Sequence, residues 1–184
     1  MLILEPCRTD DLARPGRARK GDAPSRRWSM DQNTKSGLLR VRSYLLAMLG
    51  LNLAWEIAQL PLYTIWANAP IGAAAGAVVH CTMGDVLIAG AALLIAWLVT
   101  GRPRLQASIP MKVAAVAICL GIPFTILSEW RATRVVHSWE YSSWMPVIPW
   151  LQVGLTPVLQ WFALPPIAMQ FVFGIGNRPS PRRI

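Results

Sequence analysis

The sequence is poor in charged residues. Asp, Glu, Lys and Arg together make up 15% of the 184 residues, and only 9 residues are acidic. Soluble domains carry about a quarter charged residues, so this chain has too little charge to cover a water-exposed surface of its size. The deficit argues against an ordinary soluble domain and predicts a surface that faces lipid. Tryptophan is abundant by contrast, with 9 residues, and its side chain favours the membrane–water boundary.

Cysteine and histidine are also scarce, with 3 and 2 residues. No two cysteines stand at CxxC spacing, which argues against a disulfide framework or a zinc site. His80, Asp85 and Glu129 offer another set of ligands for a divalent metal, but their spacing is not diagnostic, and we predict neither a metal nor a cofactor. The sequence lacks GxSxG, HExxH and the P-loop, so the common hydrolytic and ATP-binding signatures are absent.

The basic excess is unevenly distributed. The formal net charge is +9, and ten of the 18 Lys and Arg residues precede residue 43. The others lie between or just beyond apolar stretches, which is how membrane proteins set their orientation. We therefore predict no nucleic-acid partner. The placement of the basic residues is instead attributed to the orientation of the chain in a lipid bilayer.

Four apolar stretches are each long enough to cross the hydrocarbon, which takes about 20 residues. The sequence predicts an all-α integral membrane protein, in which the short gaps make neighbouring helices antiparallel in a four-helix bundle. The membrane domain is expected over 43–173, with spans at 43–66, 74–100, 109–130 and 147–173. Residues 1–40 are expected to be a disordered basic tail and 174–184 a second basic tail. Translation from Met30 is an alternative start.

The Lys and Arg count predicts the orientation. The two tails and the gap between the second and third spans, with Lys112 just inside the third, hold 16 of the 18 basic residues. These segments are expected in the cytoplasm, which places both termini there and the chain in a cell membrane, such as a bacterial inner membrane. Arg131 and Arg134 fall on the outer side, where Glu129 and Glu140 are available to pair with them.

Four ionisable residues inside or at the edge of the apolar stretches are the candidate catalytic groups: Glu56, His80, Asp85 and Glu129. Ionisable side chains within a span are costly and invite a functional interpretation. Glu56 and Asp85 would be an acid–base pair, with His80 positioning them or relaying protons. The alternative is that these groups only fasten helices together through hydrogen bonds.

The first and second spans carry two spaced patterns. In the first span, i, i+3, i+4 and i+7 spacing places four side chains on one helical face, namely Asn52, Trp55, Glu56 and Gln59. Asn52, Trp55 and Gln59 are candidate substrate contacts. In the second span, His80 belongs to a repeat of every four residues with Gly72, Gly76 and Gly84. Such a stripe permits close helix approach, so His80 is expected to face a neighbouring helix.

Two further groups are candidate substrate contacts. In the fourth predicted span, Gln152, Thr156 and Gln160 form an i+4 stripe, which favours interhelical hydrogen bonds first and substrate contact second. The loop before that span contains Trp139, Tyr141 and Trp144. This loop is either an aromatic belt at the outer interface, which is the favoured interpretation, or a cover over a pocket.

Counting residues along antiparallel helices places the embedded polar groups in the outer half of the bundle. The inner half is almost purely apolar, as at 91–99 and 113–120. This distribution predicts one polar cavity that opens towards the outer side. Three functions are consistent with it: binding or acid–base conversion of a lipophilic small molecule, proton- or cation-coupled transport, and a structural subunit without catalysis. The sequence leaves oligomerisation open.

Overall fold

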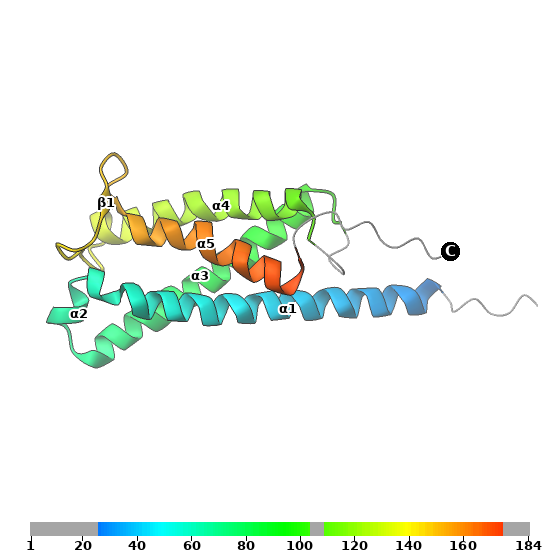
Figure 1. The fold of residues 1–184 in the computed structure, drawn as a ribbon, viewed down its shortest axis with the longest axis horizontal. Coiled ribbons are helices and arrows are strands. Elements are labelled where there is room, and N and C mark those ends of the chain that lie inside the picture. The colour runs from blue at the N-terminus through cyan, green and yellow to red at the C-terminus, as the bar shows by residue number, and fades with distance from the viewer. Residues whose placement is uncertain (1–25, 104–108, 175–184) are drawn as a thin grey trace, which may run out of the picture.

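The computed structural model describes residues 26–103 and 109–174 and is a bundle of four long helices (Figure 1). The long helices are α1 (Arg26–Gln59), α3 (Ile71–Val99), α4 (Met111–Trp130) and α5 (Leu155–Val172). The short elements are the 3-10 turn η1 (Leu60–Leu62), α2 (Ile65–Asn68), the π-helical turn η2 (Arg131–Val135) and the strands β1 (Val147–Ile148) and β2 (Val153–Gly154).

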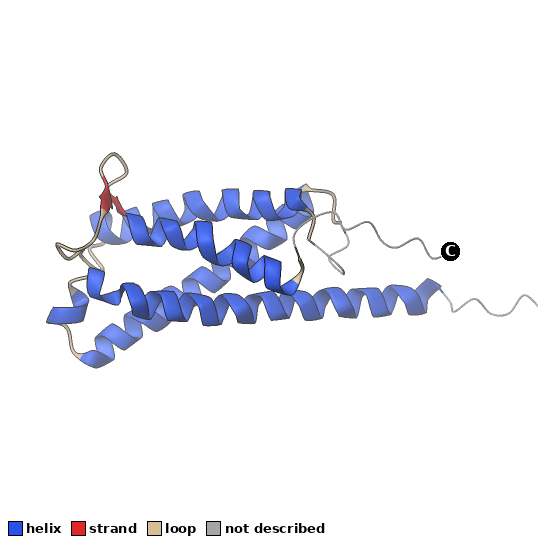
Figure 2. Ribbon diagram, viewed as in Figure 1, coloured by secondary structure: helices blue, strands red, loops and turns tan. Residues whose placement is uncertain are grey.

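The helices form a closed ring in which each long helix has two neighbours. Helix α1 packs against α3 and α5, and α4 packs against the same two helices. Figure 2 shows the strand pair and its loop at the end of the bundle where α2 lies. We call this the hairpin end, and the opposite end, where α3 connects to α4, the basic end. Within the described residues, four helices are long and apolar enough to cross a membrane, which confirms the predicted number of candidate spans.

Helix α1 differs from the predicted first span at both ends. It begins at Arg26, so the tail expected over 1–40 is helical from residue 26 onwards, while residues 1–25 lie outside the described part. With 34 residues, α1 is about 51 Å long and extends past the other helices (Figure 1). It ends at Gln59 and not near residue 66. Pro61, in the following 3-10 turn, disfavours helical backbone in the residue before it.

The start of the fourth predicted span is wrong by eight residues. The span was expected from residue 147, but β1 and β2 form an antiparallel hairpin there, and α5 begins only at Leu155. Gln152 lies at the turn of this hairpin with φ of 58°, a left-handed conformation that a helix cannot contain. The predicted i+4 stripe therefore does not include Gln152.

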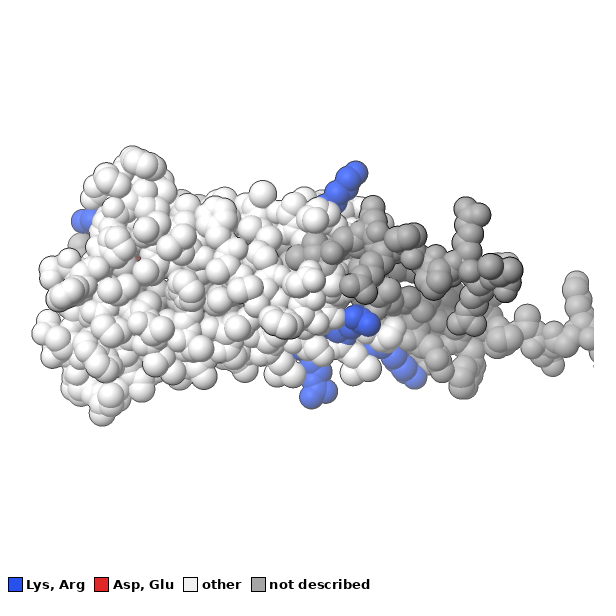
Figure 3. Space-filling view, in the orientation of Figure 1, with Lys and Arg blue, Asp and Glu red and all other residues white. Residues whose placement is uncertain are grey.

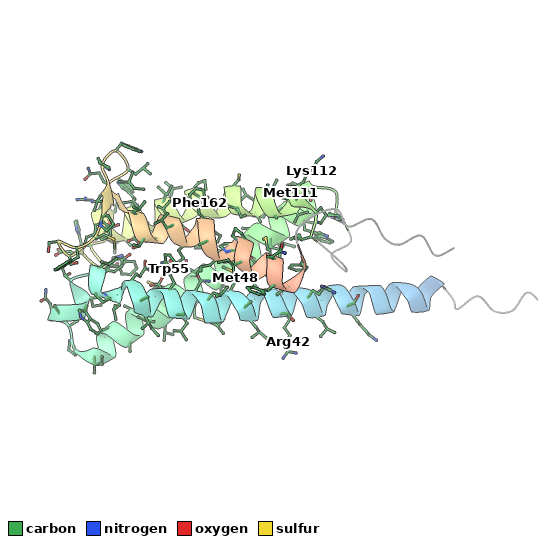
Figure 4. All side chains as sticks on the ribbon, in the orientation of Figure 1. Arg42, Met48, Trp55, Met111, Lys112 and Phe162 are labelled. Atoms are coloured by element: carbon green, nitrogen blue, oxygen red, sulfur yellow. The ribbon has the colours of Figure 1, made fainter. Side chains whose placement is uncertain are left out.

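The apolar core lies towards the basic end of the bundle. Small residues of α3 and α4, among them Ala89, Ala96 and Ala117, are buried against the large side chains of Tyr44 and Met169. Small residues let helix backbones approach closely where lipid supplies little hydrophobic driving force between helices. Figure 4 shows Met48 further along α1 from Arg42, with Trp55 beyond it towards the hairpin end.

On the visible face of the bundle, the exposed charged side chains lie at its two ends (Figure 3). On the visible face, Lys and Arg side chains gather near the basic end, with one at the hairpin end, while almost no acidic atom is visible (Figure 3). Arg42 and Lys112 lie at the basic end (Figure 4). The surface between is covered by large exposed hydrophobic side chains, including Leu46, Leu87 and Phe124.

Candidate functional site

One cavity of about 430 Å³ lies within the half of the bundle near the hairpin end. All four long helices and the loop before β1 contribute to its wall, which is mostly apolar. The predicted site residues that line it are Glu56, Gln59, His80, Asp85, Glu129, Trp139 and Gln160. The structure thus brings all four candidate catalytic residues to one cavity, although they come from three different helices.

Gln160 connects three helices beside the cavity. Its side-chain amide donates to the carboxylate oxygen Oδ2 of Asp85 on α3, at 2.7 Å, and to Oδ1 of Asn52 on α1, at 2.6 Å. Asn52 in turn donates to the carbonyl oxygen of Met48, at 2.7 Å. Asn52 and Gln160 are buried. Gln160 is part of the cavity wall, whereas Asn52 lies behind it and does not line the cavity.

Glu56 is held by the stripe that the sequence predicts on α1. The Gln59 amide donates to Oε1 of Glu56 at 2.9 Å, and the Trp55 indole N–H donates to the Gln59 side-chain oxygen at 3.1 Å. This relay fixes the carboxyl group of Glu56, which is only 8% exposed. Glu56 on α1 and Asp85 on α3 both line the cavity, as does Gln160, which donates to Asp85, so the two carboxyl groups belong to the wall of the same cavity.

Glu129 has a different environment, because two tyrosines donate to it. The hydroxyl groups of Tyr63 and Tyr141 both bond to its Oε1, at 2.9 Å and 3.0 Å. Burial and the neighbouring carboxylate raise the pKa of Tyr63 and of Tyr141 well above the usual range. A raised pKa favours the neutral phenol, so both tyrosines remain proton donors at physiological pH.

The two tyrosines also join two connecting segments across the mouth of the bundle. Tyr63 and Tyr141 form an isolated antiparallel bridge. Backbone bonds run from Thr64 N–H to the Glu140 carbonyl and from Ser142 N–H to the Leu62 carbonyl, both at 2.9 Å. The loop before β1 is therefore a cover docked on the α1–α2 connection, with Trp139 in the cavity wall. This arrangement matches the less favoured of the two predictions for the loop, a cover over a pocket.

The docking of this cover gives a testable result. Replacing both Tyr63 and Tyr141 with phenylalanine removes the two bonds to Glu129 and the bond that the Tyr141 hydroxyl accepts from Gly154 N–H, each of which contributes about 1 kcal/mol. We expect faster hydrogen exchange at the amides of Thr64 and Ser142, measured by mass spectrometry. The control is Trp144→Phe on the same loop, where the side chain is 81% exposed and exchange should not change. Unaltered exchange in the double variant would show that Glu129 does not hold the cover.

The π-helical turn η2 begins two residues after Glu129. Val136 N–H bonds to the carbonyl of Arg131, five residues earlier, and the Thr133 hydroxyl bonds to the carbonyl of Glu129, at 2.9 Å each. Such turns insert a residue into a helix and are frequent at functional sites. The turn places Arg131 in the cavity wall, while Arg134 donates to the side chain of Gln152 at 3.0 Å. The predicted partners of Arg134 were Glu129 and Glu140, whereas its side-chain hydrogen bond is to Gln152.

Three buried polar atoms near the site have no hydrogen-bond partner of good geometry within the described residues: Oγ1 of Thr125 and the indole nitrogens of Trp139 and Trp161. Thr125 is 6% exposed and lines the cavity one turn before Glu129. The indoles lie beside Glu129 and Asp85 respectively. Buried polar atoms without a partner are rare and costly. Of these residues Thr125 and Trp139 line the cavity and Trp161 does not, so the Thr125 hydroxyl is available for a polar group inside the cavity.

Three predictions about individual residues are corrected by the structure. Trp144 and Gln152 are exposed and lie outside the cavity wall. His80 lines the cavity but is itself exposed. The glycine stripe does not mediate close helix packing, because a side chain on Gly76 or Gly84 would meet no atom within 4 Å. Within the described residues, no group of His, Cys, Asp and Glu side chains is arranged to hold a metal ion.

Comparison with known proteins assigns no identity. No known protein family matches the chain, and neither curated proteins nor solved structures show significant similarity to it. Any functional conclusion therefore depends on the geometry of the cavity.

Sequence reasoning missed the apolar part of the cavity wall. Leu87 and Phe124 line the cavity and are also exposed on the outside of the bundle. An apolar residue in an apolar span carries no signal of this kind, because lipid-facing and cavity-facing side chains have the same chemistry. Only the helix packing distinguishes them.

Proposed function

We propose that the chain is an integral membrane protein. Its four long helices carry large exposed hydrophobic side chains along their length, such as Leu46, Leu94 and Phe162. Exposed apolar surface of this extent is unfavourable in water but matches the hydrocarbon of a bilayer. The concentration of charge at the ends of the bundle (Figure 3) supports the same assignment.

We also propose that the basic end faces the cytoplasm. Of the basic residues with described side chains, Lys35, Arg40, Arg42, Arg102 and Lys112 belong to this end. Arg131 and Arg134 belong to the hairpin end. The positive-inside rule then places both termini in the cytoplasm and the cavity in the outer half of the membrane.

Within this membrane domain, we propose a site that binds a lipophilic small molecule and converts it by acid–base chemistry. The observation that carries this proposal is that two carboxyl groups, Glu56 and Asp85, line one mostly apolar cavity. Two adjacent carboxyl groups in a dry environment cannot both be charged, so they are suited to share one proton. A pair that shares a proton contains an acid and a base in one place.

The chemistry follows from this arrangement. One carboxyl group gives a proton to the bound molecule while the other accepts a proton from it, so the pair keeps the same number of protons after each cycle. Asp85 keeps its orientation through Gln160, and Glu56 through Gln59. His80 also lines the cavity, where it would position the pair or relay protons. An isomerisation or an addition of water fits such a site without a cofactor.

The packing favours this function over transport. A proton or cation carrier needs polar groups along the whole path, whereas the core towards the basic end is formed by Tyr44, Met48, Ala96 and similar side chains. A purely structural role would leave no reason for a cavity of about 430 Å³ beside three carboxyl groups.

Carbodiimide labelling tests the lipid-accessible carboxyl pair. Dicyclohexylcarbodiimide dissolves in the bilayer and adds to a protonated carboxyl group to give a stable N-acylurea. We expect it to modify Glu56 or Asp85 in protein reconstituted in lipid vesicles, with the site located by peptide mass spectrometry. Glu140, exposed on the covering loop, is the control, and a water-soluble carbodiimide should modify it instead.

Two outcomes of the labelling would contradict the proposal. Equal modification of Glu56 by the water-soluble reagent would mean that the cavity is filled from the aqueous side. Absence of any modification at Glu56 and Asp85, with Glu140 modified normally, would mean that the pair holds no proton that a ligand can reach.

A further inference from the structure

The cavity reaches the lateral surface of the bundle between α3 and α4. These helices pack against each other. On each side of the opening, three residues at i, i+4 and i+7 spacing line the cavity, and the last of the three on the α4 side lies in η2. All of them are exposed or partly exposed: His80, Gly84 and Leu87 on α3, and Phe124, Ser128 and Arg131 on α4 and η2. A side chain on Gly84 would meet no atom within 4 Å, so nothing fills the space beside it.

This lateral opening has an apolar end and a polar end. Leu87 is 69% exposed and Phe124 is 55% exposed, and both lie deeper in the bundle. Because α3 and α4 are antiparallel, His80 and Arg131 both lie towards the hairpin end from these two residues. Seven residues of helix separate Phe124 from Arg131, which is about 10 Å along the axis. The lining of the opening therefore changes from apolar to positively charged over about 10 Å.

We infer that the ligand of the cavity is an amphiphile with an anionic head group, and that it enters from the bilayer between α3 and α4. This inference rests on the proposed function and names its substrate class. Arg131, the only Lys or Arg among the described residues that line the cavity, holds the phosphate or carboxylate head, because a guanidinium group binds such oxygens in a bidentate manner. The hydrocarbon chain passes between Leu87 and Phe124.

The acidic groups of the cavity are compatible with an anionic head at this place. Asp85 accepts its hydrogen bond from Gln160 on α5, and Glu129 accepts two from the tyrosines of the cover. Ser128 and the unpartnered hydroxyl of Thr125 lie on α4 within the turns that lead to Arg131. The head group is thus bound at the rim by Arg131, and the first carbons of the chain face the carboxyl pair.

Two native cysteines provide a test without a known ligand. Cys81 lines the cavity, whereas Cys119 is exposed on α4 and is not part of the cavity wall. Full-length protein in lipid vesicles is treated with N-ethylmaleimide, and labelling of each cysteine is followed by peptide mass spectrometry. At about four times its Kd, dodecyl phosphate should slow labelling of Cys81 about fivefold and leave Cys119 unchanged. Inorganic phosphate and dodecylamine should protect neither cysteine.

Matched variants separate the head-group contact from the opening. Arg131→Gln should raise the dodecyl phosphate concentration needed for protection about tenfold, a loss of about 1.4 kcal/mol. Arg134→Gln, on the same turn but outside the cavity wall, should have no effect. Leu87→Trp should slow labelling of Cys81 without any ligand, because the larger side chain narrows the opening, whereas Leu127→Trp, exposed on α4 outside the wall, should not.

Several outcomes would overturn the inference. Equal protection by inorganic phosphate would indicate an anion site reached from water, and equal protection by dodecylamine would show that the head-group charge is not recognised. Protection that survives Arg131→Gln, or labelling unchanged in Leu87→Trp, would remove the named residues from the site. Carbodiimide labelling of Glu56 remains a separate result, so the proposed acid–base pair can stand when this substrate class fails.

Discussion

Substituting Gly121 with alanine is expected to be among the most destabilising single changes in this bundle. A Cβ atom on Gly121 of α4 would overlap the ring of Trp161 on α5. Trp161 is only 2% exposed and has no space to move away. Overpacking of this kind costs about 1–3 kcal/mol, occasionally more, and we expect the upper part of this range because the overlap involves a rigid ring. Thermal unfolding in mild detergent, followed by near-ultraviolet circular dichroism, measures the loss.

Gly50→Ala is the matched control for this substitution. Gly50 lies inside α1, and an added Cβ would meet no atom within 4 Å. Alanine there should be neutral or stabilising by up to about 1 kcal/mol. Adding Trp161→Leu to Gly121→Ala should restore part of the lost stability, because it removes the overlapping ring. If Gly121→Ala unfolds like the unmodified protein, α4 and α5 do not pack as described.

Gln160→Leu is expected to affect both stability and the site. The leucine side chain has a similar size but removes the bonds to Asn52 and Asp85. Hydrogen bonds between membrane helices contribute about 0.6–2 kcal/mol each, and a carboxyl group left without a donor adds a further cost. We expect a total loss of about 2–4 kcal/mol, together with a change in the carbodiimide reactivity of Asp85, which loses its positioning donor.

Phe162→Leu on the same helix is the control for Gln160→Leu. Phe162 is 59% exposed, and its truncation should leave both stability and carbodiimide reactivity unchanged. A Gln160→Leu variant that is as stable as the unmodified protein, with unchanged reactivity at Asp85, would contradict the role of Gln160 as the link between α1, α3 and α5.

Much of the fold could be predicted because spans depend on composition. A run of about 20 apolar residues between polar segments is a long-range property, and the number of candidate spans follows from it. The ends of the spans were less predictable. The hairpin at 147–154 is as apolar as a span, and Gln152 fits an i+4 stripe on paper, so only the backbone geometry shows that Gln152 is in a turn.

The candidate site was predictable where spacing determines it. The residues at i, i+3, i+4 and i+7 on α1 include Glu56 and Gln59, which are bonded as neighbours in the structure. The contact of Gln160 with Asn52 joins positions 108 residues apart, and no local pattern contains that information. Tyr63 is another example, because it donates to Glu129 from an extended position after η1, 66 residues away along the chain.

The most direct test of the central claim is to compare the lipids bound to the unmodified protein and to Glu56→Gln. Both proteins are purified in mild detergent, shown to be equally folded, and subjected to native mass spectrometry and lipidomics. Glutamine keeps the size and hydrogen-bonding capacity of Glu56 but cannot exchange a proton as an acid. We expect a specific amphiphile to co-purify with the unmodified protein and to be lost from Glu56→Gln. If both folded proteins carry only bulk phospholipid, the carboxyl pair serves to hold the helices together, and the proposed site is contradicted.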